Sequence, residues 1–314
     1  MTEEVAEATL VAARRRRRWS ATRWRDARDG YIFILPWLLG FFIWTAGPMV
    51  ASISIAFTDW RIVTAPHFVG FANFVALFQD PRIRTSLFNT TVYVVLGVPT
   101  HIFFALLAAL LLNLKLRGIG IYRTLFYLPY ITPLVANSLL WLWIFNTNFG
   151  LANWLLTLFH LPAVYWLQDP RIVKESLVIM SWWTIGGQMV ILLAGLQGVP
   201  RHLYDAASID GATRWSRFWN VTFPMLTPSL FFNLTLALIG AFQVFVQSYV
   251  ITNGGPEDSS LFYVLYLYRV AFQNFDMGYA SAMAWLLFLV VLVITLVQFR
   301  FANRWVFYEA ELKR

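Results

Sequence analysis

The side chains best suited to acid–base, nucleophilic or metal chemistry are few in this 314-residue chain and lie far apart. The sequence has no cysteine, and its four histidines are scattered: His67, His101, His160 and His202. A thiolate nucleophile and a cysteine-held zinc or iron–sulfur site are therefore excluded. None of the three lysines, Lys115, Lys174 and Lys313, follows a glycine, so a Walker-type phosphate loop is absent. The motifs G-x-S-x-G and H-E-x-x-H are also missing. We expect no metal site and no enzymatic activity in this chain.

The composition is that of a membrane protein. Hydrophobic residues make up 59% of the chain and charged residues 13%, whereas soluble domains are about 25% charged. Aromatic residues make up 18%, which suits a chain with many lipid–water interfaces. The net charge of +8 could suggest a nucleic-acid partner. However, the Arg14–Arg18 run lies just before a long apolar segment, where it is better explained as a cytoplasmic retention signal, so we expect no nucleic acid.

Six apolar stretches are each long enough to cross a bilayer as a helix of about 20 residues. They are Tyr31–Phe57, Ser86–Asn113, Tyr122–Phe145, Ser176–Gln197, Leu226–Thr252 and Tyr279–Phe301. Strand alternation is absent from them. The expected fold is therefore an all-α polytopic membrane protein with six transmembrane helices.

The distribution of basic residues predicts the orientation. The N-terminus, the second loop, the fourth loop and the C-terminus together hold 18 of the 24 lysines and arginines, so these parts should be cytoplasmic. The prediction divides the chain into a basic N-terminal segment (1–30), a six-helix transmembrane domain (31–301) and a cytoplasmic tail (302–314). The longest cytoplasmic connection is the loop 198–224.

The predicted spans carry almost no ionisable group. His101 alone lies well inside one, and a lone histidine is more often a packing residue than a proton relay. Prolines fall inside several spans: Pro36, Pro48, Pro99, Pro129 and Pro133. They are interpreted as kinks in packed helices rather than as breaks that line a path. Any energy for transport should therefore enter from outside the membrane region.

The fourth loop carries the strongest local signal. Pro200 suits the first position of a helix, and Asp205 lies near the positive end of that helix dipole. Gly211 permits a sharp bend, and the spacing of Asp210 and Arg214 favours an i,i+4 ion pair in a second short helix. The loop is thus expected to form helix, bend and helix. It could dock into another protein or lie on the membrane surface as an amphipathic linker.

This loop resembles the conserved loop of permease subunits of binding-protein-dependent ABC importers. Their pattern is Glu-Ala-Ala, three residues, Gly, nine residues and Ile-x-Leu-Pro. Here Asp205-Ala206-Ala207 leads to Gly211 and then to Val221-Thr222-Phe223-Pro224, with the same spacing. The departures, Asp205, Val221 and Phe223, are conservative.

Other segments resemble the carbohydrate importers of the maltose and glycerol-3-phosphate type. They are Val69–Phe74, Leu87–Thr90, Phe242–Phe245 and Thr252–Pro256. Members often have Asp where this chain has Val246. The similarity runs from about Tyr31 to the C-terminus.

The resemblance implies a location in a bacterial-type plasma (inner) membrane, a function and a set of partners. The function is import of a sugar or sugar derivative, delivered by an extracellular or periplasmic solute-binding protein. The other partners are a second homologous permease and an ATP-binding subunit dimer at the cytoplasmic face. This chain would hold no cofactor, because ATP and Mg²⁺ bind to the ATPase. The implied ATPase-coupling residues are Tyr204, Asp205, Ala206, Ala207, Asp210, Gly211, Ala212, Arg214 and Phe218.

Polar and aromatic residues inside the fourth and fifth spans are candidates for a substrate path, because sugars are held by polar side chains and aromatic faces. They are Trp182, Trp183, Thr184, Gln188, Asn233, Gln243, Gln247 and Tyr249. Gln243 and Gln247 are expected to share one helix face. Interhelical hydrogen bonds and interface anchoring are the alternative roles for these residues. For the chain as a whole, the alternative is an autonomous secondary carrier or channel for a small polar solute.

Overall fold

The computed structural model describes residues 21–114 and 117–307, with side chains from residue 24 onward. In these ranges the regular secondary structure is helical, apart from two isolated antiparallel bridges, Thr58–Phe68 and Arg61–Asp276. Parts of the predicted N-terminal segment and C-terminal tail lie outside the described residues.

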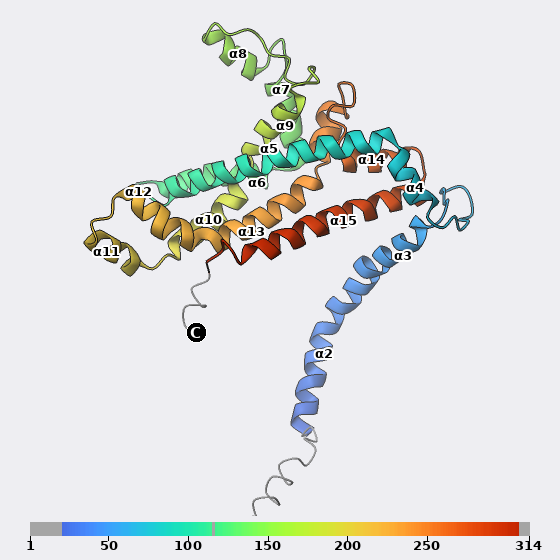
Figure 1. Cartoon of the computed structure of the whole chain (residues 1–314), viewed down its shortest axis with the longest axis horizontal. Coiled ribbons are helices and arrows are strands. Elements are labelled where there is room, and N and C mark those ends of the chain that lie inside the picture. Colours follow the sequence, from blue (N-terminus) through green and yellow to red (C-terminus); the bar gives the residue numbers. More distant parts are fainter. Residues whose placement is uncertain (1–20, 115–116, 308–314) are drawn as a thin grey trace, which may run out of the picture. The chain divides into compact units, whose positions relative to one another are not determined.

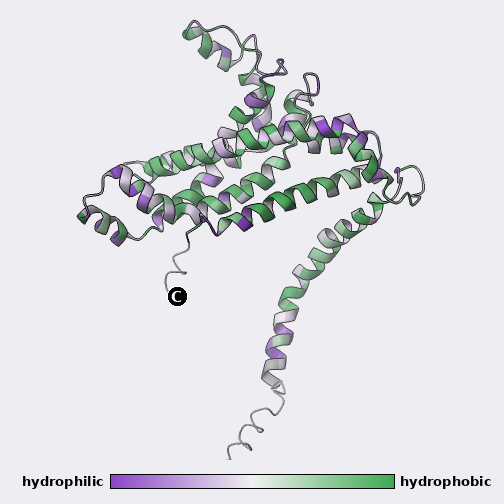
Figure 2. Cartoon of the chain, viewed as in Figure 1, coloured by the Kyte–Doolittle hydropathy of each residue, from purple (hydrophilic) through white to green (hydrophobic). Residues whose placement is uncertain are grey.

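The predicted spans correspond to four continuous helical stretches and two bent pairs. The continuous stretches are Trp24–Ala56, Pro81–Leu112, Arg214–Phe242 and Met277–Ala302. The bent pairs are Ile119–Ile131 with Leu134–Ile144, and Val173–Trp182 with Gly186–Gln197. Each pair is long and apolar enough to cross a membrane when it is counted as one span, which gives the six that the sequence predicts. Figure 2 shows the hydrophobic residues that run along most of α15 (Met277–Ala302).

The chain forms two compact units, Met1–Ser54 and Ile55–Arg314. In the first unit, α2 (Ala21–Phe41), η1 (Phe42–Ala46) and α3 (Gly47–Ala56) follow without a gap. The π-turn η1 ends where Gly47 N–H donates to Phe42 O, just before Pro48. Proline has no N–H with which to continue the hydrogen bonds of an α-helix. The additional residue of the π-turn therefore lies just before Pro48. Pro36 and Pro48 both lie inside helices, as predicted.

The second unit contains the remaining elements (Figure 1). In chain order they are α4 (Ala72–Gln79), α5 (Pro81–Leu112), α6 (Ile119–Ile131), α7 (Leu134–Ile144), α8 (Leu151–Leu158), α9 (Val173–Trp182), α10 (Gly186–Gln197), α11 (Arg201–Ile209), α12 (Arg214–Arg217), η2 (Phe218–Thr222), α13 (Phe223–Phe242), η3 (Ser248–Thr252), α14 (Tyr263–Tyr268), η4 (Arg269–Gln273) and α15.

The long helix α5 is the centre of the second unit. It packs against α9, α10, α13 and α14, and Figure 1 shows α5, α13 and α15 side by side. Ala105 and Ala109 of α5 are fully buried in a cluster with Leu192 and Leu226. Their small side chains let the backbones of α10 and α13 approach closely. Asp80 begins α5 by accepting from Arg82 N–H at 2.8 Å.

Polar residues of α5 hold the segment that follows η3. Asn89 Nδ2 donates to Asp258 O at 2.8 Å and to Leu261 O at 3.2 Å. Thr90 Oγ1 accepts from Tyr263 N at 2.9 Å. At the same end of α5, Tyr266 donates to Asp80 Oδ2 at 2.6 Å. Burial, and then this hydrogen bond, raise the pKa of Tyr266. These contacts hold the segment 258–266 against the N-terminal part of α5.

One proline breaks its span, contrary to the prediction of simple kinks. Pro99 and Pro129 lie inside α5 and α6, as expected of kinks. Between α6 and α7 the chain turns by 99°, and Thr132, just before Pro133, is extended at ψ 135°. A residue before proline is pushed out of the helical region by the proline ring. The third span is therefore a broken one.

Candidate functional site

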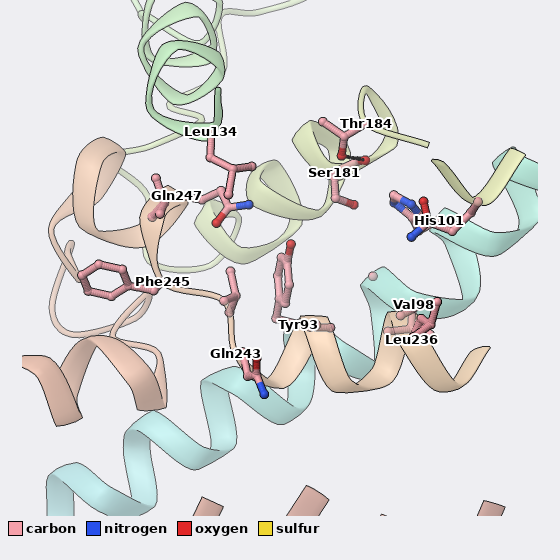
Figure 3. Close-up of a pocket in the computed structure, with 17 residues that line it drawn as sticks. Tyr93, Val98, His101, Leu134, Ser181, Thr184, Leu236, Gln243, Phe245 and Gln247 are labelled. Atoms are coloured by element: carbon pink, nitrogen blue, oxygen red, sulfur yellow. Dashed lines mark hydrogen bonds between the residues drawn. The ribbon is translucent and has the colours of Figure 1, made fainter. Parts of the chain in front are cut away.

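A cavity of about 280 Å³ lies among α5, α7, α9, α10, α13 and the segment 243–247. Its polar lining residues are Tyr93, His101, Ser181, Thr184, Gln188, Gln243 and Gln247. The rest of the wall is apolar, with the ring of Phe245 and small residues such as Gly97, Gly240 and Ala241. In Figure 3, Tyr93 stands between Gln243 and Ser181. We call this cavity the polar pocket.

Two interruptions of helices build the polar pocket. The first separates α9 from α10, which are bent by 48°. There Trp183 N donates to Met180 O and Thr184 N to Ser181 O, at 3.2 and 3.1 Å. These i→i+3 bonds tighten the end of α9. The Thr184 hydroxyl also donates to Ser181 O at 3.0 Å, as Figure 3 shows.

The second interruption ends α13 at Phe242, inside the stretch Leu226–Thr252 that the sequence predicts as one span. Gln243 is the residue that caps α13, and Gln243 N donates to Gly240 O at 3.1 Å. The prediction that Gln243 and Gln247 share one helix face is therefore wrong. Both still line the polar pocket, because the residues 243–247 that follow the break form part of its wall.

A glycine allows the close approach of α10 to α6 beside the polar pocket. A Cβ atom on Gly186 would lie 2.6 Å from Phe126 O and 2.9 Å from Tyr127 Cα. Real Cβ atoms do not come this close to backbone. The first residue of α10 must therefore lack a side chain if α6 and α10 are to keep this contact.

Four of the eight predicted substrate-path residues line the polar pocket: Thr184, Gln188, Gln243 and Gln247. The other four are placed elsewhere. Trp182 Nε1 donates to Thr100 Oγ1 at 3.0 Å, and its ring packs on Phe104 with centroids 4.6 Å apart. Trp183 is half exposed and lies beside Trp141.

Asn233 and Tyr249 are also outside the polar pocket. Asn233 is fully buried, and its Nδ2 donates to Ser229 O at 2.9 Å within α13. Tyr249 stacks on Phe245, with ring centroids 5.3 Å apart. Tyr249 therefore supports a wall residue of the polar pocket rather than forming the wall itself.

Sequence reasoning missed the contribution of α5. Tyr93, Gly97 and His101 line the polar pocket, and they are spaced four residues apart on one face of the helix. That spacing of a phenol, a glycine and an imidazole is the signal that could have identified them. His101 Nε2 and Gln188 Oε1 are both buried, and the two side chains lie close enough to interact with each other. They can bond to each other or to a polar ligand in the pocket.

The predicted loop 198–224 forms helix, bend and helix, as the sequence indicates. α11 is followed by Gly211 at φ +72° and then by α12. Thr213 caps α12 by accepting from Ser216 N at 3.2 Å. A contact of 3.0 Å between the hydroxyls of Tyr204 and Thr222 joins α11 to η2, which follows α12. We call residues 201–218 the coupling loop.

The residues predicted to couple to an ATPase are divided between two faces. The exposed ones are Asp205, Ala206, Asp210, Gly211 and Arg214, and the half-buried ones are Tyr204, Ala207, Ala212 and Phe218. Ile209 is 87% exposed at the end of α11. The loop therefore presents short side chains, an aliphatic tip and two carboxylates on its outer face.

Three details of this loop differ from the prediction. Pro200 is the N-cap of α11 rather than its first residue. α12 is not separate from the fifth span, because Arg214–Phe242 is one continuous helical stretch. Asp210 ends α11 whereas Arg214 begins α12, so the two are not on one helix. No ion pair joins them among the described residues.

Comparison with known proteins gives a consistent result. Residues 69–306 match the protein family described as binding-protein-dependent transport system inner membrane component. The chain is 43% identical to the probable ABC transporter permease protein YesP of Bacillus subtilis, over 91% of this chain and 94% of that protein. It is 34% identical to the lactose transport system permease protein LacF of Rhizobium radiobacter, over 90% of this chain and 96% of that protein.

A further relative and a solved structure are also components of transport systems. The trehalose/maltose transport system permease protein MalF of Thermococcus litoralis is 32% identical over 88% of this chain and 95% of that protein. The fold matches a chain of a bacterial alginate ABC transporter crystallised with an alginate pentasaccharide-bound periplasmic protein. That match has a TM-score of 0.78 and 26% identity, and covers 90% of this chain and 97% of that one.

Proposed function

Because this chain belongs to the family of binding-protein-dependent transport system inner membrane components, we propose that it is the sugar-translocating permease of an ABC importer. It is a multi-pass membrane protein. The observation that carries the choice of substrate is the polar pocket, a cavity with hydrogen-bonding side chains from α5, α9 and α10, from the turn between α9 and α10, and from the segment 243–247. Lactose and trehalose/maltose systems among its relatives support the same class of substrate.

The chemistry of the polar pocket suits a polyhydroxylated ligand. Hydroxyls, carboxamides and an imidazole can each donate to or accept from sugar hydroxyls. The rings of Tyr93 and Phe245 can cover the C–H faces of a sugar ring. Among the described residues, the lining holds no Asp, Glu, Lys or Arg. Binding would then depend on many moderate hydrogen bonds, each contributing about 1 kcal/mol, and such binding is readily reversed during transport.

The energy enters, in this proposal, through the coupling loop. Its exposed outer face docks on a separate ATPase subunit, which binds ATP and Mg²⁺, and its second helix continues directly into the fifth span. A rigid-body movement of α12 is therefore transmitted along α13, which ends at the polar pocket. A second homologous permease completes the path, and an external solute-binding protein supplies the sugar.

The orientation follows from the same proposal. The coupling loop and both termini face the cytoplasm, and the membrane is the bacterial plasma (inner) membrane. The concentration of basic residues on that side supports this assignment. The segment between α7 and α9, which includes α8, then faces outward.

The double substitution Gln243→Leu with Gln247→Leu tests the substrate assignment. We expect uptake of sugar to fall, or its sugar preference to shift, while the assembled complex is recovered in normal yield. Gln197→Leu is the matched control, because Gln197 is exposed at the end of α10 and outside the pocket. Unaltered uptake by the double variant across several sugars would contradict the assignment.

A further inference from the structure

A second cavity, which we call the arginine groove, is lined by residues at the C-terminal end of α5 and by residues of α12. Figure 1 shows where these two helix ends lie in the fold. It has a volume of about 530 Å³ and lies outside the polar pocket. Its apolar wall comes mainly from leucines of α5, including Leu107 and Leu111, and from Leu114 just beyond. Its opposite wall includes Arg214, Arg217 and Phe218.

The apolar wall is exposed rather than covered. Leu107, Leu111 and Leu114 are 43%, 52% and 54% exposed. Leu107 and Leu111 are four residues apart and therefore lie on one face of α5, about one turn apart. In a membrane-embedded helix, an exposed leucine face of this kind is suited to contact with lipid acyl chains.

The two arginines give the groove a cationic end. Arg217 is half-buried, and its Nη1 donates to Ser208 Oγ at 3.2 Å. In the part of the chain that the structure describes, neither arginine has a carboxylate within 4.0 Å. Two guanidinium groups beside an apolar wall, with no internal counter-charge, complement a phosphate group that carries acyl chains.

An aromatic cluster indicates the depth of this cationic end. Trp215 lies between the two arginines in sequence, and Trp219 lies two residues after Arg217. The two tryptophans are 70% and 45% exposed, and their ring centroids are 5.6 Å apart. Trp219 also contacts Phe223, with centroids 5.0 Å apart. Tryptophan side chains concentrate at the level of the lipid headgroups. The arginines are therefore at headgroup level, and the leucines extend from there toward the acyl region.

We propose that the arginine groove binds an anionic phospholipid, with its phosphate on Arg214 and Arg217 and its acyl chain along the leucines of α5. Basic pockets between helices on one side of a membrane are suited to such headgroups. The lipid would contact the side of the coupling loop that faces α5, with Arg214 at the edge of the exposed face, and would leave Asp205 and Gly211 free. The proposal requires a membrane-embedded chain.

The test is native mass spectrometry of the assembled importer after equilibration with equal amounts of phosphatidylglycerol and phosphatidylcholine that have identical acyl chains. We expect the wild type to retain phosphatidylglycerol preferentially. Each phosphate contact by a surface arginine contributes about fivefold in affinity, so Arg217→Gln should lower the preference about fivefold and the double variant with Arg214→Gln about 30-fold. Arg201→Gln, an exposed arginine of α11 outside the groove, should leave the preference unchanged.

Leu111→Trp provides a second test that keeps both arginines. The larger side chain would fill the groove, so retention of both lipids at this site should fall. Equal retention of the two lipids by the wild type would overturn the proposal, as would an equal loss in Arg201→Gln. Lipid that binds only after the ATPase is removed would also overturn it, since the groove would then be an ATPase contact.

Discussion

Replacing Gly211 with alanine isolates the backbone geometry of the coupling loop. Gly211 has φ +72°, and a Cβ atom there would have nothing within 4 Å. The substitution therefore introduces no clash within this chain, and its cost is the left-handed backbone itself, about 1–2 kcal/mol for an alanine. If the ATPase recognises the bent loop, its association with the permease should weaken by a factor of about 5 to 30.

Gly118→Ala is the matched control for this prediction. Gly118 has φ +76° and also has nothing within 4 Å of its built Cβ, but it begins α6 in a different loop. The two alanines carry the same backbone strain, so both variants should insert normally. Only Gly211→Ala should weaken the ATPase. Gly211→Asn should cost less than alanine, because asparagine tolerates the left-handed region.

The assay is titration of detergent-solubilised permease with purified ATPase subunit, with binding followed by fluorescence anisotropy. We expect Gly211→Leu to abolish transport while leaving membrane insertion intact, since it adds bulk to the docking face as well as strain. Equal weakening of the ATPase complex by Gly118→Ala and Gly211→Ala would refute the reasoning, because the effect would then be general strain. Unchanged affinity in Gly211→Ala would refute it as well.

Two further predictions follow from packing and from topology. Gly186→Ala should lower the melting temperature of the complex and disturb the polar pocket, because its Cβ would lie 2.6 Å from Phe126 O. Gly120→Ala on α6 is the control: its Cβ would have nothing within 4 Å, so the melting temperature should not change. A wild-type melting temperature for Gly186→Ala would show that α6 and α10 are not in close contact. A cysteine at Phe159, 74% exposed, should react with an impermeant external thiol reagent in intact cells, and one at Ile209, 87% exposed, should not; the opposite labelling would reverse the orientation.

The six apolar segments were predictable because bilayer thickness sets a length that simple hydropathy can detect. The helix, bend and helix of the coupling loop were predictable for a similar local reason, since Gly211 and the capping Thr213 act on their own backbone. In both cases the deciding physics lies within a few residues of the position concerned.

The breaks inside the spans were harder to predict. Pro133 could have been read either as a kink or as a break, and the 99° turn depends on how neighbouring helices accept the freed backbone groups. At Thr184 and at Gln243 no proline marks the interruption. There the sequence pattern is continuous, and the helix ends are set by tertiary packing. This is why Gln243 and Gln247 were placed on one helix face.

The polar pocket was predictable only in part. Four of its residues were predicted from the polar side chains of the fourth and fifth spans, together with the resemblance to maltose-type permeases. Tyr93 and His101 come from α5, which is 32 residues long. Which face of such a helix turns toward a cavity depends on the helices around it, and that information is not local in the sequence.

The most direct test of the central claim is transport by purified components in proteoliposomes. A binding screen of the cognate solute-binding protein would first select the radiolabelled sugar. We predict accumulation of that sugar only when this chain, the second permease, the ATPase, ATP and the loaded binding protein are all present. Uptake by this chain alone, without ATP and without the binding protein, would contradict the account and identify the protein as an autonomous carrier or channel.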